Sequence, residues 1–307
     1  MKLEKILKRK KIERPFGIFL SGGLDSGILA ALLKPDFAIT CNFKGEFYDE
    51  LAYTEATAKH LKIPLTIITP DGSDFKPVLE KALKVIGNPV NSVSIYPWYK
   101  IMEKVTKMGA KRMVGGEGCD EAFGGYSRYL ILKKIHELYN MESLKGYGPL
   151  LDSIFTSFID THSRISGIDK EILKKRYKEK EDKGIINQIG WAEFNESLEP
   201  IRQMELRLAK YFGLDMYLPF YDKEVQDYGW SLKDDEKIKG ETRKLAVYNI
   251  AKKYLPTRVY ERKDKKGFGS PANEWCGSKN KYDKTKYLEL QREICKGFQV
   301  IVDVNNI

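Results

Sequence analysis

The sequence FLSGGLDSGILAALL joins a short apolar run to small helix-forming residues through two glycines and a carboxylate. Gly22 and Gly23 permit positive φ and let the backbone approach a ligand closely. Backbone N–H groups before a helix N-terminus bind anions, and Ser21 and Ser26 add hydroxyl donors. Asp25 would repel a phosphate unless a cation lay between them, and Mg²⁺ suits that position because it binds carboxylates and phosphate oxygens together. The turn therefore predicts a phosphate site with Mg²⁺; an ordinary strand-to-helix turn is the alternative.

A second glycine-rich segment, VGGEGCDEAFGGYSRY, begins at residue 114 and contains Glu117, Asp120 and Glu121. Carboxylates this close repel one another, which is typical of sites that bind a metal or transfer a proton. An acidic surface turn is the alternative. The tyrosines and the arginine at the end of the segment either contact a substrate or pack in a core.

Both segments need a scaffold that places them at one edge of a sheet, and the pattern of apolar runs along the sequence predicts such a scaffold. Strands are expected over residues 16–20, 37–42, 65–69 and 111–114, and helices over residues 27–33, 49–61 and 98–108. Alternation at short intervals favours an α/β fold, a parallel sheet with helices on both faces. Ligands bind at the carboxyl ends of such strands, where both glycine-rich segments begin.

The composition and the predicted secondary structure change along the sequence and divide the chain into four parts. We expect a basic N-terminal arm over residues 1–14, an α/β core over 15–130, a mainly helical part over 131–275 and a C-terminal tail over 276–307. The stretch QVIVDVNNI in the tail reads as a strand or a partner contact.

Composition limits the class of protein. With 42% hydrophobic residues among 307, the chain can form a substantial core, and no long apolar run or signal peptide is evident. We expect a soluble, cytoplasmic protein that contacts no membrane. Four cysteines without a CxxC pair predict free thiols and no zinc site. The net charge is +10, and half of this excess lies in the first fourteen residues, which contain seven Lys or Arg and two Glu. A basic surface can attract nucleic acid or small anions, and a solvated charged face is the alternative. Nucleic acid is the less favoured partner, because no known nucleic-acid motif accompanies the charge.

The motif SGGLDS resembles the pyrophosphate loop, SGGxDS, of the ATP pyrophosphatases, and the second segment resembles SGEGxDExFGGYxRY of class B asparagine synthetases and their β-lactam synthetase relatives. Four further pieces follow the order of that family. They are FYDELAYTEATAKHLKIP, NPVNSVSIYPWY, YLPFYDKEV and TRKLAVYNIAKKYLPTRVYERKDKKGFGSP. The resemblance covers residues 15–275 and implies the PP-loop fold, with the whole of that range forming one synthetase-like domain.

The resemblance also implies an ATP-dependent ligase that adenylates a carboxylate, such as aspartate, and transfers ammonia or an amine, releasing AMP and pyrophosphate. The residues expected to contact the nucleotide are Leu20, Ser21, Gly22, Gly23, Asp25, Ser26, Phe43 and Gly116. Asp25 and Asp120 are expected to hold Mg²⁺, and Glu117 to accept a proton from the nitrogen nucleophile. Lys265 is expected to stabilise charge on the α-phosphate or the tetrahedral intermediate, with Lys266 as its rival.

Three departures from the family pattern leave the substrates open. Lys2 stands where the nucleophilic cysteine of the glutaminase domain would follow Met1, so we expect nitrogen from ammonia, another amine or a separate glutaminase subunit. Asn88 and Asn91 replace acidic residues in the loop thought to shape the amino-acid pocket, and a glycine replaces the usual serine at position 116. A homodimer is also expected.

Three alternatives remain open at this point. The chain could be a PP-loop enzyme that modifies a tRNA base, and the basic N-terminal arm favours this alternative. It could be the synthetase subunit of a two-chain amidotransferase. It could also be a non-catalytic nucleotide sensor, which the presence of both aspartates and the lysine disfavours.

Overall fold

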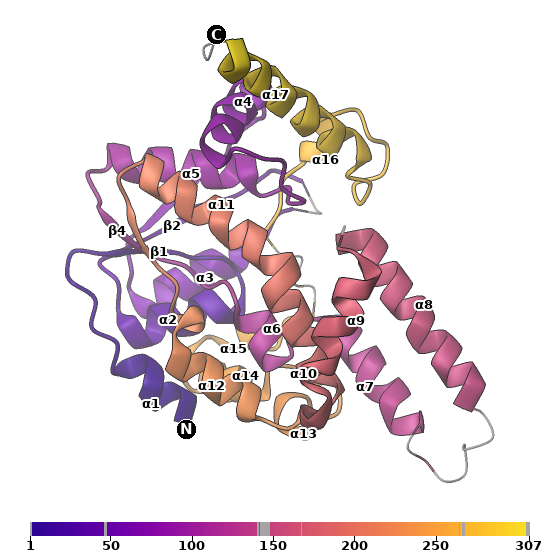
Figure 1. The fold of residues 1–307 in the computed structure, drawn as a ribbon. Helices are drawn as coiled ribbons and strands as arrows, with labels where there is room; N and C mark the ends of the chain where they lie inside the picture. Colours follow the sequence, from indigo (N-terminus) through magenta and orange to yellow (C-terminus); the bar gives the residue numbers. More distant parts are fainter. Residues whose placement is uncertain are drawn as a thin grey trace. The chain divides into compact units, whose positions relative to one another are not determined.

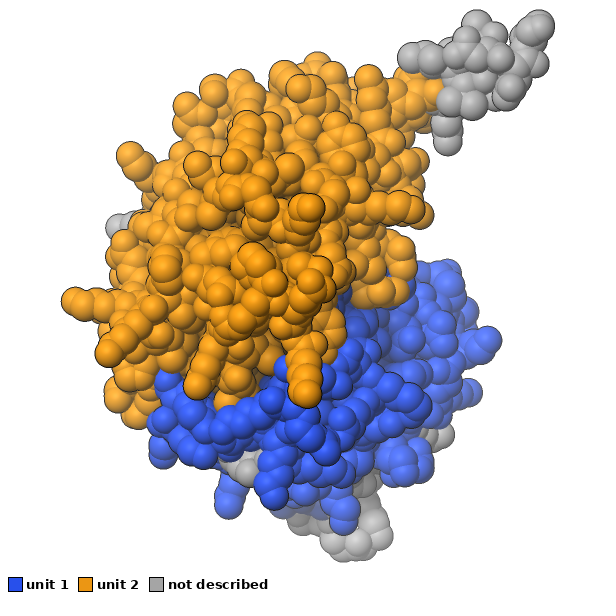
Figure 2. Space-filling model, turned by 90° about the vertical axis from the view of Figure 1, so that its left-hand side faces the viewer, with its two compact units in different colours: residues 1–10, 116–199, 218–254 blue, residues 11–115, 200–217, 255–307 orange. Residues whose placement is uncertain are grey.

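The computed structural model describes residues 2–45, 48–139, 141, 148–166, 168–263, 265 and 268–304. Contacts divide the chain into two compact units, coloured separately in Figure 2. The first unit comprises residues 1–10, 116–199 and 218–254, and the second comprises residues 11–115, 200–217 and 255–307. Each unit therefore combines stretches that are far apart in the sequence, and the domain boundaries expected from the sequence remain a prediction.

The second unit is built on a five-stranded parallel sheet in the order β3-β2-β1-β4-β5 (Figure 1). Its strands are β1 (Gly17–Phe19), β2 (Phe37–Cys41), β3 (Leu65–Ile68), β4 (Arg112–Val114) and β5 (Asp215–Tyr217). Strand β1 is central, with β2 on one side and β4 on the other. The direction of winding reverses beside β1, so the loop that follows β1 lies at the switch point where such sheets bind ligands.

Helices cover both faces of this sheet. In Figure 1, α5 lies on one face and α2 and α3 on the other. The helices of this unit are α2 (Leu24–Leu33), α3 (Leu51–Leu61), α4 (Phe75–Ile86), α5 (Ile95–Lys107), α11 (Leu198–Tyr211), α15 (Thr257–Tyr260), α16 (Ala272–Trp275) and α17 (Thr285–Val304), with α11 entering it at residue 200. The predicted fold class, a parallel α/β sheet followed by a mainly helical region, is confirmed.

The structure adds two elements to those expected. Helix α4 buries Val78, Leu79, Leu83 and Ile86 at helical spacing, and Pro77 is tolerated because the first turn of a helix has no internal use for its N–H. Strand β5 forms in a region expected to be helical, and it pairs with β4 through Met113 and Met216. Helix α2 also begins at Leu24, three residues earlier than expected.

The regular elements among the described residues of the first unit are helices, together with one isolated antiparallel bridge between Lys239 and Thr242. Its helices are α1 (Lys2–Lys8), α6 (Cys119–Phe123), α7 (Ser127–Tyr139), α8 (Gly148–Ser166), α9 (Lys170–Lys178), η2 (Glu181–Lys183), α10 (Ile185–Ala192), η3 (Glu193–Ser197), η4 (Pro219–Tyr221), α12 (Lys223–Ser231), α13 (Asp234–Lys237) and α14 (Leu245–Tyr254). Tyr129, Leu132, Ile186 and Ile189 form the centre of its core. This core is separate from that of the second unit, which gathers around Ile39, Tyr96, Leu208 and Tyr287 in the part of the chain described.

The basic N-terminal segment is not a free arm. Leu3, Ile6 and Leu7 of α1 are fully buried, and α1 packs against α12 and α14 within the first unit. Several of its cations have acidic partners: Lys8 pairs with Glu4, and further pairs join Arg9 to Glu224, Lys10 to Asp222 and Arg14 to Asp36. Much of the positive charge that suggested nucleic acid is therefore matched locally.

The C-terminal segment is helical rather than a strand. Helix α17 runs to Val304, which contradicts the strand expected for QVIVDVNNI over residues 299–304; residues 305–307 lie outside the described residues. Tyr287 and Cys295 of α17 are buried in the core of the second unit beside α4. All four cysteines are free thiols, as predicted. None of the helices in the described part of the chain has the length and apolar character that a membrane span requires.

Candidate functional site

The glycine-rich turn after β1 is organised by its two serines. The Ser26 hydroxyl accepts a hydrogen bond from the Ser21 backbone N–H at 3.0 Å, and the two hydroxyl oxygens are also 3.0 Å apart. The Gly23 N–H donates to Ser21 Oγ at 3.1 Å. The turn therefore has a fixed shape without any ligand, and the first N–H groups of α2, which have no partner within a helix, lie at its end.

Close approach, rather than positive φ, explains the glycines of this turn. Gly23 has a φ of −89°, and neither glycine is among the described residues with positive φ, so that part of the expectation was wrong. A Cβ at Gly22 would lie 2.7 Å from Arg262 Nη1 and 2.8 Å from Tyr53 Cβ. A side chain at position 22 would collide with the groups that support the turn.

Arg262 is a functional residue that the sequence analysis did not single out. Its Nη1 donates to the Gly22 carbonyl at 2.9 Å, and its Nη2 donates to the Glu50 carboxylate. The guanidinium also lies over the Tyr53 ring, 4.0 Å from its centre. The Arg262 side chain is only 4% exposed. It therefore supports the turn from inside the protein and is not itself available to a ligand. The sequence signal that could have identified Arg262 is its position in the segment RKDKKGFG.

Lys265, the lysine expected to stabilise charge, lies at the same turn. Its Nζ is 3.4 Å from Asp25 Oδ2, and its Cε is 3.6 Å from where a Cβ on Gly23 would be. The structure thus brings together two residues that are 240 positions apart in the sequence. Lys266, the rival candidate, lies outside the described residues.

Two of the expected nucleotide contacts are core residues. Leu20 is 2% exposed, and its N–H donates to the Ile39 carbonyl at 2.9 Å. Phe43 is 3% exposed, and its ring centre lies 5.7 Å from that of Trp275 and 6.4 Å from that of Tyr96. Packing accounts for both side chains, so a place beside the adenine stays a prediction that their contacts do not support.

The carboxylate-rich loop of the first unit is fixed by a buried ion pair. Asp120 Oδ1 accepts from Lys244 Nζ at 2.8 Å, and the Lys244 side chain is only 6% exposed. A Cβ on Gly125 would lie 1.8 Å from Asp120 Oδ1 and 2.0 Å from Lys244 Cε, so only glycine fits beside this pair. Arg243 Nη1 donates to the Gly125 carbonyl at 2.6 Å. Lys244 and Arg243 are further functional residues that the sequence analysis missed, although they lie in a quoted motif.

Gly116 and Glu117 open the same loop, and both are partly buried. Gly118 follows them with a φ of +89° and starts helix α6, a conformation that favours glycine. A Cβ there would also lie 3.0 Å from the Tyr221 ring. The glycine spacing of the motif therefore has a local cause, because the backbone must turn sharply between Glu117 and the first turn of α6.

Glu121 faces inward rather than toward solvent. Burial, reinforced by the neighbouring Asp120 carboxylate, raises the pKa of Glu121 to about 7, while the Tyr126 hydroxyl that donates to it at 2.6 Å opposes the rise. Arg128 lies over the Tyr126 ring at 3.8 Å from its centre. It forms a two-pronged pair with the buried Glu193, through bonds of 2.8 and 2.6 Å. The end of the motif therefore packs in the first unit, which supports the packing alternative for its tyrosines and arginine; a substrate contact stays a prediction.

The residues present are compatible with Mg²⁺ held jointly by protein and phosphate. No three acidic, histidine or cysteine side chains gather to hold a metal within the described ranges. Such a cluster is not required, because Mg²⁺ commonly takes one or two carboxylates plus phosphate oxygens and water. Asp25 belongs to the second unit and Asp120 to the first, and their joint binding of one ion remains a prediction.

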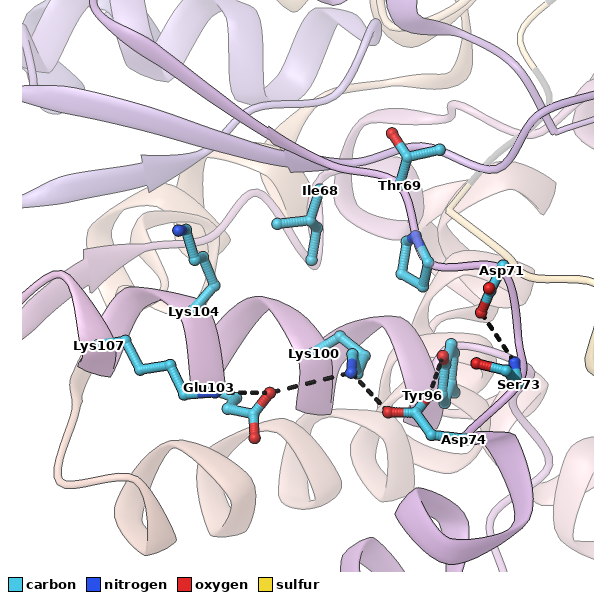
Figure 3. A pocket seen from close by; sticks show the side chains of 11 residues that line it. Ile68, Thr69, Asp71, Ser73, Asp74, Tyr96, Lys100, Glu103, Lys104 and Lys107 are labelled. Carbon is cyan, nitrogen blue, oxygen red and sulfur yellow. Dashed lines mark hydrogen bonds and ion pairs between the residues drawn. The ribbon is translucent and has the colours of Figure 1, made fainter.

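A cavity of about 410 Å³ lies elsewhere in the second unit, at the carboxyl end of β3 (Figure 3). Lys100 donates to Asp74 at 2.7 Å and lies 3.9 Å from Glu103, as the dashed lines in Figure 3 show. Lys104 and Asp71 also line it. Its charges largely compensate one another, and none of the described residues that line it is a predicted site residue.

Comparison with known proteins agrees with the motifs. The family model for asparagine synthase matches residues 3–290. Asparagine synthetase [glutamine-hydrolyzing] 1 of Bacillus subtilis is 25% identical over 85% of this chain and 47% of its own length. Putative asparagine synthetase [glutamine-hydrolyzing] 1 of Methanocaldococcus jannaschii is 26% identical over 81% of this chain and 50% of its own length. The chain spans about half the length of these curated relatives. Since the family match covers nearly all of the described structure, the chain belongs to the asparagine synthase family.

Proposed function

We propose that the chain is an ATP-dependent ligase that forms an amide and releases AMP and pyrophosphate. Its substrates would be a small carboxylic acid, such as aspartate or a related amino acid, and ammonia or an amine. The observation that most supports this is the placement of Lys265 beside Asp25 at the glycine-rich turn after the central strand. A cation and a carboxylate at a switch-point turn suit a phosphate-transfer site better than a structural turn.

In the first half-reaction, the substrate carboxylate attacks the α-phosphorus of ATP. A new bond forms between the carboxylate oxygen and phosphorus, the bond to the β-phosphate breaks, and pyrophosphate leaves. Ser21, Gly22, Gly23 and Ser26 would bind the β- and γ-phosphates through hydroxyl and N–H donors. Lys265 would exchange its contact with Asp25 for the charge that develops on the α-phosphate, a contribution of about 3–4 kcal/mol for one well-placed donor.

In the second half-reaction, ammonia attacks the carbonyl carbon of the acyl-adenylate and AMP leaves. Glu117 would accept a proton from the nitrogen as the carbon–nitrogen bond forms. Gly118 and Gly125 contribute indirectly, because they allow the sharp turns that present Glu117 and hold Asp120 against Lys244.

Mg²⁺, when bound by Asp25 and Asp120, would neutralise phosphate charge and favour departure of pyrophosphate. The nitrogen would enter as free ammonia or from a separate glutaminase subunit. The relatives' names describe glutamine hydrolysis by those proteins, and a screen with both nitrogen sources would decide which applies to this chain.

The test is a pyrophosphate-release assay of the purified chain across amino-acid carboxylates, each with ammonium chloride or with glutamine. We expect pyrophosphate and AMP in equal amounts, dependent on both the carboxylate and ammonia. Asparagine formation from aspartate would identify the substrate. Release of ADP instead of AMP, or no turnover with any carboxylate, would overturn the proposal.

A further inference from the structure

The peptide group between Gly22 and Gly23 is hydrogen-bonded at both of its ends. Its carbonyl oxygen accepts from Arg262 Nη1 at 2.9 Å, and its N–H donates to Ser21 Oγ at 3.1 Å. Because the C=O and N–H bonds of a planar trans peptide point in opposite directions, the carbonyl faces Arg262 and the N–H faces the serine hydroxyl. Arg262 is almost fully buried, whereas Ser21 is partly exposed, so a ligand can reach this peptide only from its N–H side.

The two glycines leave the direction of this peptide weakly determined. Turning the peptide over changes ψ of Gly22 and φ of Gly23, and glycine tolerates both changes at low cost. The φ of Gly23, −89°, would become positive, a region that few other residues adopt. The hydrogen bonds at the two ends of the peptide must therefore decide which way it faces.

The two groups that bind the peptide differ in what they accept. A serine hydroxyl both donates and accepts, so Ser21 can bind either the N–H or the carbonyl of this peptide. The Arg262 guanidinium only donates. A reversed peptide would direct its N–H at the guanidinium and leave two buried donors without an acceptor, which is costly. Arg262 is therefore the group that selects the direction of the peptide.

The direction of the peptide decides whether the turn attracts or repels an anion. With the carbonyl directed at Arg262, the Gly23 N–H lies on the side of the Ser21 hydroxyl, which is 3.0 Å from the Ser26 hydroxyl. Phosphate oxygens can accept from these three donors together. A reversed peptide would place a carbonyl oxygen on that side, where its partial negative charge would repel phosphate.

Arg262 is itself held by neighbouring elements of the second unit. Its Nη2 donates to the Glu50 carboxylate at the start of α3, and its Cζ lies 4.0 Å from the centre of the Tyr53 ring. Helix α15, which ends two residues before Arg262, packs against α3. Leu255 lies against α2, because a Cβ on Gly27 would be 2.8 Å from Leu255 Cδ1. The segment that carries Arg262 is thus fixed on the helix that begins at the turn and on the next one.

We propose that Arg262 is a positioning residue for the β- and γ-phosphates of ATP, and that Glu50 orients its guanidinium. Arg262 touches no ligand; it keeps the N–H of the peptide between Gly22 and Gly23 directed at the phosphates. The fork of a guanidinium suits this role, because one nitrogen binds the carbonyl while the other binds the carboxylate. This inference rests on the proposed function, since it takes the turn to bind the phosphates of ATP.

Calorimetric titration of the full chain with ATP, inorganic pyrophosphate and AMP, in buffer containing magnesium chloride, tests the inference without requiring turnover. The double variant Arg262→Met/Glu50→Gln removes both charges and so leaves no buried charge without its partner. We expect ATP and pyrophosphate to bind about tenfold more weakly, as when the peptide faces the phosphates in about one molecule in ten. AMP lacks the β- and γ-phosphates, so its affinity should stay within about twofold of wild type.

Two single variants are the matched controls. In Glu50→Gln, the amide oxygen still accepts from Arg262, so ATP should bind more tightly than it does to the double variant. Arg258→Met removes an exposed arginine that lies 5.7 Å from the centre of the same Tyr53 ring, and binding should be unchanged. Unchanged affinity of the double variant for pyrophosphate would overturn the inference. An equal loss for AMP would indicate a merely structural role and overturn it too.

Arg262→Lys is the second variant, and it decides in the same way should the double variant not fold. It keeps a positive charge beside Glu50 but has one nitrogen in place of the fork. Because a carboxylate attracts that nitrogen more strongly than a carbonyl does, the Gly22 carbonyl should lose its donor. Pyrophosphate should then bind about threefold or more weakly while AMP does not.

The two proposals fail in different ways. A wild-type chain that binds ATP and pyrophosphate but turns over no carboxylate overturns only the ligase reaction, and the titrations still decide the role of Arg262. An active wild type whose double variant keeps its affinity for pyrophosphate overturns only the role of Arg262. A wild-type chain that binds neither ATP nor pyrophosphate overturns both.

Discussion

Each of the two glycine-rich segments contains an aspartate that pairs with a lysine from a later part of the chain, and the two pairs differ in burial and distance. In the first unit, Lys244 is 6% exposed and lies 2.8 Å from Asp120. In the second unit, Lys265 is 34% exposed and lies 3.4 Å from Asp25. The first pair is short and buried, and a glycine is required beside it. The second is longer, and its lysine is partly exposed although Asp25 is buried.

This difference indicates what each lysine can do. A buried ion pair that loses one partner leaves an uncompensated charge, so Lys244 is committed to holding Asp120 in place. Lys265 is partly exposed and its contact with Asp25 is longer, so Lys265 can exchange this partner for an arriving anion more readily than Lys244 can leave Asp120. One lysine therefore belongs to the scaffold of the site and the other to its chemistry.

The largest expected effect concerns Lys265. Lys265→Met should reduce pyrophosphate release by about 10²–10³-fold, the usual cost of losing one donor to a developing charge. Its free energy of unfolding should fall by about 1 kcal/mol or less, because the contact with Asp25 is 3.4 Å long and Lys265 is partly exposed. Steady-state kinetics and urea denaturation check the two parts. Lys266→Met is the matched control, and a larger loss in that variant would assign the catalytic role to the neighbour.

Lys244→Met should lower the free energy of unfolding far more than Lys265→Met does. Removing the ammonium leaves Asp120 without its short, buried partner, which should lower the free energy of unfolding by about 3 kcal/mol, near the low end for such pairs because Asp120 keeps some exposure. Urea denaturation of the variant measures this. The double variant Lys244→Met/Asp120→Asn should recover part of the loss, and a single variant as stable as wild type would break the comparison between the two pairs.

Alanine substitutions at Gly125 and Gly23 test the same difference between the two aspartate–lysine pairs. Gly125→Ala places a Cβ within 2.0 Å of both partners of the buried pair, so we expect a loss of stability of about 2 kcal/mol or more. Gly23→Ala places a Cβ 3.1 Å from Ser21 Oγ and 3.6 Å from Lys265 Cε, which the turn can accommodate. That variant should be destabilised by less than about 1 kcal/mol yet lose activity. Thermal unfolding and pyrophosphate release check both; equal stability of the two variants would contradict this account.

A third lysine, Lys237, makes the free energy of unfolding depend on pH. Lys237 is almost completely buried, donates to Asn187 Oδ1 at 2.7 Å, and has its pKa lowered by burial from 10.5 to about 7. The unfolded chain therefore binds the extra proton between these values, and stability should rise with pH across that window. Relative to Lys237→Met, the wild type should gain about 2 kcal/mol between about pH 7 and about pH 9. Urea denaturation at both pH values measures the difference, and parallel behaviour of the two proteins would refute it.

The sequence allowed the fold class and most strands to be predicted because buried parallel strands form short apolar runs. Ile18, Ile39 and Val114 are such residues, and all three are fully buried. Strand β5 was not predictable in the same way, since three residues carry no periodic signal and their partner strand lies about one hundred positions earlier. Helix α4 was missed because its early proline resembles a break, although its apolar spacing is helical.

The site was predictable in its motif residues and not in the residues that support them. Asp25 and Lys265 could be chosen as candidates because family motifs mark them, and the structure brings them together, while their roles stay predictions. Arg262 and Lys244 form buried hydrogen bonds and ion pairs with partners that lie far away in the sequence. Local pattern gives no measure of burial, and burial is what separates these supporting groups from ordinary surface cations.

The path of the chain between the two units has a consequence for how the protein is made. The chain passes from one unit to the other after residues 10, 115, 199, 217 and 254. A ribosome must therefore synthesise the chain through α14 before the first unit has all its parts, although α1 emerges at the very start. Truncation after residue 10, 115, 199 or 217 would leave both units incomplete, and truncation after residue 254 would leave the second unit incomplete, so no single cut of the chain separates the two units as intact modules.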